Sequence, residues 1–166
     1  MTDFAASWDA ASSALDLVIA NGDLGEDDGL DSAVIISLMT DALAGPDDAI
    51  PDGTADRRGW WGDPVTSETG APPDRIGSKL WLFVRAKATE ATRRGIEQAI
   101  RDALQWGIDD GVWVRVDVTT SWQALGSLAA AVTLVRQAGR TTASRIYDAT
   151  WTATTGLAVA PRGAIS

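Results

Sequence analysis

The segment best equipped for contacts between molecules carries two arginines and two tryptophans within five residues. It is the octet Asp56, Arg57, Arg58, Gly59, Trp60, Trp61, Gly62 and Asp63. Guanidinium groups bind carboxylates or carbonyl oxygens through two parallel bonds, and tryptophan and arginine dominate binding at protein interfaces. We expect one indole to anchor the loop and the other, on the opposite side of an extended chain, to contact a partner. Alternatively, both indoles fill the core and the arginines pair with Asp56 and Asp63.

The chain has no histidine and no cysteine, which excludes several kinds of site. Excluded are Ser-His-Asp and Cys-His nucleophiles, thiolate or imidazole metal ligands and disulfide bonds. Catalysis would have to use carboxylates, Lys79, Lys87 or Tyr147. A chain with 23 acidic residues offers carboxylate pairs by chance, so the two-carboxylate pattern of a glycosidase carries little weight. The residues by themselves therefore give an enzyme little support, and a carboxylate-based hydrolase stays open as the alternative.

An acidic stretch at 23–31 raises the question of a calcium site. A calcium loop needs a glycine at its sixth position and a glutamate at its twelfth. Counted from Asp23, these positions hold Asp28 and Val34. The stretch is therefore predicted to be a solvated loop, and we expect neither a metal nor a cofactor.

Length and charge narrow the class of protein further. The 166 residues are predicted to form a single domain, with 1–10 and 156–166 as mobile tails. A net charge of −9 argues against a nucleic-acid partner, which would require a basic face. We find neither a membrane-spanning apolar stretch nor a secretory signal.

Hydrophobic periodicity predicts an α+β domain. Helices are expected at 33–44, ended by Gly45, and at 92–108, where an apolar stripe recurs at helical spacing. A short helix at 80–84 would begin after Ser78 as its cap. A short strand is expected at 15–19. Between these elements lies a long loop at 45–77 without either period.

The second half of the chain predicts a mostly antiparallel sheet packed against the long helix. Strands are expected at 112–118, 125–136 and 144–151, joined as a meander. In the first of them, alternation places four valines against the helix: Val112, Val114, Val116 and Val118. Trp113 would then point to the other face and meet a loop or another subunit. This makes Trp113 a further candidate partner-binding residue.

The octet resembles the signature of the Mu-type phage tail baseplate proteins known as the gene product 46 family. Two further stretches resemble that family in the same order: 77–82 followed by 85–87, and 103–106 followed by 109–111. Stretches at 22–24, 30–41 and 51–53 resemble it as well, so the likeness runs from about residue 15 to residue 151. It leads us to expect a bulky apolar residue at position 107, where this chain has Gly107.

The resemblance implies a structural, non-enzymatic component of the wedge in a contractile tail baseplate. Such a protein is assembled in the host cytoplasm and becomes part of the virion. The resemblance implies six copies around the central hub, bound to larger wedge proteins near the first layer of the sheath. An accessory regulator with the same small fold is a third possibility.

Overall fold

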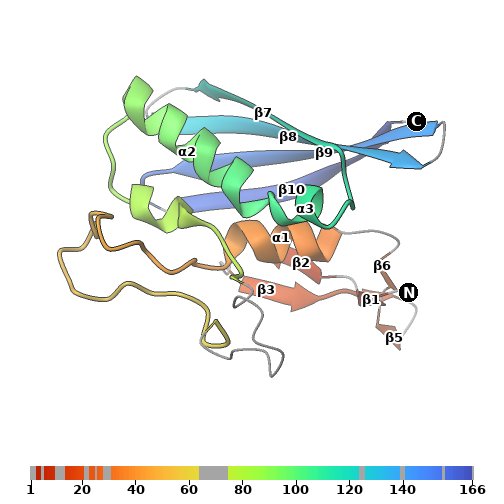
Figure 1. Ribbon diagram of the computed structural model, residues 1–166, viewed down its shortest axis with the longest axis horizontal. Helices are drawn as coiled ribbons and strands as arrows, with labels where there is room; N and C mark the ends of the chain where they lie inside the picture. The colour runs from red at the N-terminus through yellow and green to blue at the C-terminus, as the bar shows by residue number, and fades with distance from the viewer. Residues whose placement is uncertain are drawn as a thin grey trace.

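A four-stranded antiparallel sheet with helices on one face forms the centre of the molecule (Figure 1). The computed structural model describes residues 3–4, 6–9, 14–20, 23–24, 26–27, 31–63, 75–123, 126–138, 141–154 and 156–165. The strand order is β10-β9-β8-β7, where β7 is Arg115–Trp122, β8 is Ser127–Ala138, β9 is Thr141–Thr152 and β10 is Gly156–Ile165. The expected α+β class and the antiparallel meander are confirmed.

The last strand, β10, was not expected, because the sequence predicts a mobile tail at 156–166. That prediction is wrong for the described residues: β10 pairs along β9, with Leu157 opposite Trp151 and Val159 opposite Ala149. Alanine, glycine and proline give this segment little β-propensity of its own. Backbone hydrogen bonds to β9 and the burial of Leu157 and Val159 outweigh that weakness.

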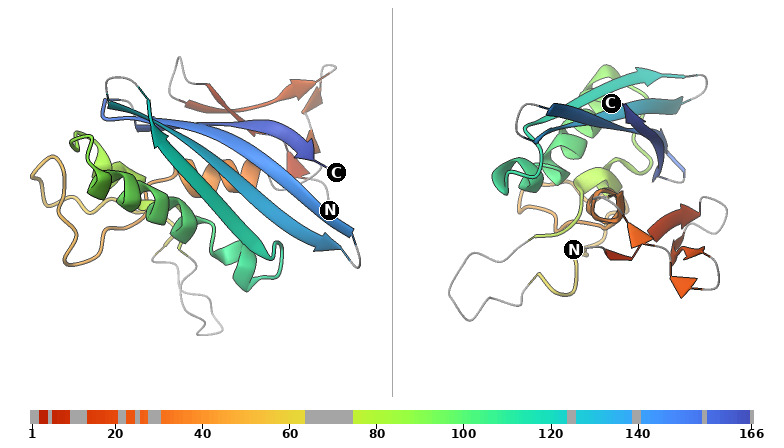
Figure 2. Two further views of the ribbon diagram at one scale, coloured as in Figure 1. Left: turned by 90° about the horizontal axis from the view of Figure 1, so that it is seen from above. Right: turned by 90° about the vertical axis from the view of Figure 1, so that its right-hand side faces the viewer.

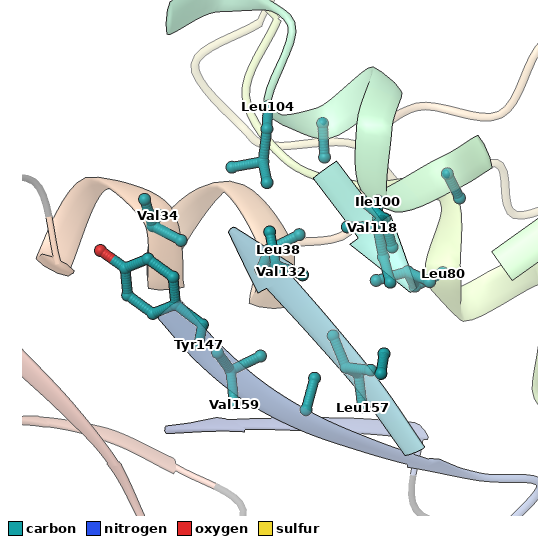
Figure 3. Close-up of a cluster of buried hydrophobic side chains, with 14 of the residues drawn as sticks. Val34, Leu38, Leu80, Ile100, Leu104, Val118, Val132, Tyr147, Leu157 and Val159 are labelled. Atoms are coloured by element: carbon teal, nitrogen blue, oxygen red, sulfur yellow. The ribbon is translucent and has the colours of Figure 1, made fainter. Parts of the chain in front are cut away.

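The long helix α2 spans Glu90–Ala103 and begins after Thr89, whose side chain accepts the N–H of Thr92. Its apolar stripe lies against the sheet, as predicted. Ile96 and Ile100 are fully buried, and Ile100 belongs to the same buried cluster as Val118 (Figure 3). The expected single helix at 92–108 is interrupted after Ala103 and resumes as the short α3, Trp106–Asp109.

Two shorter elements complete the helical layer: α1, Asp31–Met39, and the 3-10 helix η1, Lys79–Phe83. The prediction of a short helix capped by Ser78 is confirmed. α1 ends earlier than the predicted 33–44, because the chain after Met39 turns to bond with residue 78. At its other end, the Asp31 carboxylate accepts the buried Tyr147 hydroxyl at 2.5 Å, which ties α1 to β9.

The N-terminal residues form small two-stranded pairs beside α1 (Figure 2). The strands are β1 Asp3–Phe4, β2 Ala6–Asp9, β3 Ala14–Leu17, β4 Ile19–Ala20, β5 Asp23–Leu24 and β6 Glu26–Asp27. β1 pairs with β6, β2 with β3, and β4 with β5, all antiparallel. The expected strand at 15–19 is thus divided between β3 and β4, and part of the expected tail at 1–10 is paired. No helix in the described ranges is long and apolar enough to span a membrane.

The predicted register of the first sheet strand is wrong at Trp113. Its indole is 1 % exposed and donates to the Leu104 carbonyl at 3.1 Å, whereas Val114 is 54 % exposed. The N–H groups of Val112 and Trp113 both donate to the Gly107 carbonyl, so the chain still curls around the end of α3 there. Strand alternation therefore begins only at β7, where Val118 is buried as predicted. Trp113 is a core residue and is withdrawn as a partner-binding candidate.

Gly107 explains how Trp113 fits into the core. A Cβ atom at position 107 would lie 2.0 Å from Cζ2 of the Trp113 ring. The ring also packs edge-to-face on Trp106, with centroids 4.8 Å apart. The bulky residue expected at position 107 would occupy the same space as the Trp113 indole.

Replacing Gly107 by alanine is expected to lower the free energy of unfolding by about 1–3 kcal/mol, because the added methyl overpacks the core. The loss should appear in urea unfolding even though alanine favours helices. Gly45→Ala is a matched control, since its Cβ would meet Asp48 Oδ2 at an ordinary 3.4 Å. Equal stability of the Gly107→Ala variant and the unaltered chain would contradict this packing.

Glu97 links α2 to the sheet edge. Its carboxylate pairs with Arg101 at 2.7 Å and with Arg93 at 2.8 Å, and it accepts the Thr120 hydroxyl at 3.0 Å. Burial alone raises the pKa of Glu97, but the hydrogen bonds from Arg101, Thr120 and Arg93 outweigh it and hold the pKa below the ordinary 4.5. The folded state therefore favours the ionised carboxylate.

The pH dependence of stability follows from this lowered pKa. The contribution of Glu97 is fully present above the unfolded pKa, near 4.5, and is lost as the pH falls through the lower folded value. Urea unfolding at a series of acidic pH values should give a shallower loss of stability for Glu97→Gln than for the unaltered chain. Identical slopes below pH 4.5 would argue against this role.

Candidate docking site

Ser78 is the buried residue at which the end of α1, the base of the long loop and the start of η1 meet. Its Oγ donates to the Leu38 carbonyl at 2.7 Å and accepts the N–H of Leu80. Its backbone N–H donates to the Thr40 carbonyl, and its own carbonyl accepts the N–H of Ala42. These bonds fix the direction in which the chain leaves α1 and enters the loop that carries the octet.

Arg57 is used inside the loop. Its Nη1 donates to the carbonyl oxygens of Ala44 and Gly45, and its Nη2 donates to that of Pro46 at 2.8 Å. The Ala44 N–H returns a bond to the Arg57 carbonyl at 3.0 Å. This guanidinium therefore holds the entering and leaving arms of the loop together. The prediction that it would fork onto a partner does not describe its position here.

Arg58 is also bound within the chain. Its Nη1 lies 2.6 Å from Oδ2 of Asp41, and its Cζ lies 4.5 Å from the centre of the Trp81 ring. A cation over an aromatic face is attracted by the ring quadrupole. The backbone of Arg58 is left-handed, with φ 51°, and its N–H bonds to Asp56 Oδ1 at 2.8 Å. The alternative, in which the arginines pair with Asp56 and Asp63, is thus not seen either. The carboxylate that pairs with the Arg58 guanidinium belongs to Asp41.

The two tryptophans lie side by side. The expectation of opposite directions assumes an extended chain, but a turn closes from the Asp63 N–H to the Trp60 carbonyl at 3.0 Å. The ring centroids are 5.0 Å apart. Trp60 is partly buried against Gly62, where a Cβ would fall 1.9 Å from Cζ3 of the ring. Trp61 is 81 % exposed, the highest value among the large apolar side chains whose exposure the structure gives.

The apolar surface continues from the tryptophans to Leu43. Gly59 has φ 103°, and a Cβ there would come within 3.1 Å of Leu43 Cβ. Leu43 is 37 % exposed. We call Leu43, Gly59, Trp60 and Trp61 the tryptophan platform. Its base is fixed by Arg57 and by the Ser78 bonds.

Asp63 closes the octet on the buried side. It is 8 % exposed, and its Oδ1 accepts the N–H of Ile76 at 3.4 Å. Among the described residues, its Oδ2 has no hydrogen-bond partner. Asp63 therefore faces the interior and offers no carboxylate to solvent.

Sequence reasoning did not find the side chains that support the platform. Asp41 and Trp81 hold Arg58, and the Trp81 indole also donates to the Ala42 carbonyl at 2.8 Å. They lie 17 and 23 positions from Arg58, and their pairing follows no local spacing. The one available signal is that Trp81 falls in the second stretch of family resemblance.

The described carboxylates can be compared with what a metal site and an acid catalyst each require. No group of three or more metal-ligating side chains occurs there. A general acid at a glycosidic bond needs a raised pKa. The described carboxyl groups whose pKa clearly departs from the ordinary value are all shifted downward: Asp48, Asp52, Glu90 and Glu97. Part of the 23–31 stretch lies outside the described residues.

A comparison with known families matches residues 30–141, and the matching family is described as Phage protein GP46. The chain belongs to this family. The GP46 match covers α1, the whole octet, α2, α3, β7 and β8. It therefore includes the tryptophan platform and every side chain described above as its support.

Two relatives of this chain carry informative names. Baseplate protein gp46 of Escherichia phage Mu is 40 % identical over 111 residues, covering 64 % of this chain and 68 % of the relative. Mu-like prophage FluMu protein gp46 of Haemophilus influenzae is 33 % identical over 151 residues, covering 91 % of this chain and 98 % of the relative. No solved structure matches the chain.

Replacing Arg57 by alanine should loosen the loop, whereas replacing Trp61 should not. Loss of three carbonyl contacts is expected to lower the free energy of unfolding by about 1–2 kcal/mol and to speed amide exchange at Ala44. Trp61→Ala removes an exposed side chain and should stay within about 0.5 kcal/mol of the unaltered protein. Hydrogen exchange with urea unfolding distinguishes them, and slow exchange at Ala44 in Arg57→Ala would contradict the assignment.

Proposed function

We propose that this chain is a structural, non-enzymatic component of the baseplate wedge in a contractile phage tail. It lies in the virion, at the tail baseplate, and is present in six copies around the central hub. It docks larger wedge proteins close to the first layer of the sheath. Membership of the GP46 family and the name of the phage Mu relative support the baseplate role.

The docking role is carried by one observation, the exposure of Trp61 on a fixed loop. An indole exposed to water leaves a large apolar surface unburied. Burial of that surface against a partner would lower the free energy, which is why tryptophans so often anchor protein interfaces. Preorganisation adds to this, since a side chain on a rigid base loses less entropy on binding. The bonds from Arg57, Arg58 and Ser78 supply that base.

A cell-wall hydrolase remains the enzymatic alternative, but no observation favours it. Glu90 and Glu97 both pair with arginines, and both have lowered pKa values. An acid catalyst would need the opposite shift. Incubation of the purified protein with peptidoglycan provides the direct test, and we expect no release of soluble fragments.

Co-expression of the tagged chain with the other tail proteins of the same phage tests the proposal. We expect wedge components to co-purify and to be identified by mass spectrometry. Trp61→Ala should weaken that association by at least ~2 kcal/mol, as loss of a central aromatic anchor does, while the melting temperature stays unchanged.

Val114→Ala is the matched control, because Val114 is also an exposed apolar side chain but lies outside the platform. It should bind like the unaltered chain. If Trp61→Ala and Val114→Ala both retain full affinity, the platform is not the docking site. If no tail protein co-purifies with the unaltered chain, the wedge assignment itself fails.

A further inference from the structure

The loop that carries the tryptophan platform turns its cations inward. Residues 41–63 contain six aspartates and two arginines. The Arg57 guanidinium donates to three backbone carbonyls. That of Arg58 pairs with Asp41 and lies over the Trp81 ring. The guanidinium groups that the sequence suggests for recognising an acidic partner are thus already bound within the chain.

The carboxylates of the same loop divide into two groups. Asp41 pairs with Arg58, Asp48 pairs with Lys79 at 2.7 Å, and Asp63 is buried. The other three, which we call the acidic rim, are exposed and form no ion pair with a described residue: Asp47, Asp52 and Asp56.

Two of the three rim carboxylates, those of Asp52 and Asp56, are held by hydrogen bonds within the loop. Asp52 accepts the N–H and the hydroxyl of Thr54, which lower its pKa below the ordinary 3.8. Asp56 accepts the N–H of Arg58. The loop extends away from the sheet as one excursion, drawn in orange and yellow in Figure 1. The rim and Trp61 therefore belong to the same projecting segment.

We propose that the surface that receives Trp61 is positively charged: an apolar pocket on another protein, flanked by lysine or arginine side chains that face the acidic rim. This rests on the proposed docking function and specifies its partner. Burial of the indole supplies affinity, and opposite charges steer the encounter and fix its orientation. The sign of the partner's charge is the reverse of what the exposed-arginine interpretation of the octet predicts.

A second copy of this chain is the competing occupant, because residues 79–101 carry six basic side chains against two acidic ones. Its overall charge of −9 opposes that association, since two copies repel each other at long range. Several of those cations are also engaged within α2, where Arg93 and Arg101 pair with Glu97. A different, cationic protein fits the rim better.

The test measures association of the purified chain with a tail-protein complex that was assembled without it. A variant with Asp47→Asn, Asp52→Asn and Asp56→Asn keeps the side-chain acceptors that fold the loop but removes the rim charges. The matched control neutralises three aspartates outside the loop, with Asp102→Asn, Asp109→Asn and Asp117→Asn, and has the same net charge. Rates are measured at low and high sodium chloride, and light scattering gives the mass of the free chain.

We expect the rim variant to associate about tenfold more slowly than the unaltered chain at low salt, with the difference vanishing at high salt. The control should keep most of the unaltered rate. A rim variant that binds as fast or faster overturns the cationic partner, and so does a free chain that is a salt-sensitive oligomer. If the rim variant behaves as the unaltered chain while Trp61→Ala still weakens binding, only this inference fails. If neither the rim variant nor Trp61→Ala changes the association, the tryptophan platform is not the docking site.

Discussion

The parallel pairing of two backbone segments at Ser78 is the constraint on which the rest of this structure depends. Residues 77–78 run beside residues 40–42 so closely that a Cβ on Gly77 would lie 2.5 Å from the Thr40 carbonyl oxygen. The hydroxyl of Ser78 satisfies a carbonyl near the end of α1 and an N–H at the start of η1. Because free polar groups at buried helix ends are destabilising, one side chain that serves both ends lets α1 and η1 meet under the sheet.

Beyond that pairing, the loop is held by contacts between charged side chains and the backbone. Arg57 binds carbonyls instead of a carboxylate, which leaves the loop with an excess of acid at its surface. Arg58 adopts a left-handed backbone that few residues other than glycine accept, and Asp56 and Asp41 hold it there. Such strain persists only where the surroundings enforce it, and it is commonest at functional sites. These contacts restrain the backbone just before Trp61, whose indole is exposed.

Local patterns predicted much of the fold. The apolar stripe of α2, the Ser78 cap and the antiparallel order of β7, β8 and β9 could be read from periodicity and turn residues, because those signals depend on neighbours in sequence. Trp113 and β10 could not. The ring of Trp113 is placed by a tight coil around the Gly107 carbonyl, and β10 is placed by its partner strand. The octet was recognised from composition, but composition does not say whether an arginine finds its acceptor inside the chain or outside it.

The position of β10 has a consequence for synthesis on the ribosome. Val34 of α1 lies in the same buried cluster as Val159, and Leu157 lines a pocket with Leu38 and Trp81. α1 and η1 precede β10 in the chain, so they are synthesised before the strand that covers this side of them. During translation, the apolar side chains of α1 and η1 that contact β10 therefore stay uncovered on that side until β10 has emerged from the ribosome. A nascent chain stalled before residue 156 would expose that surface to chaperones and proteases.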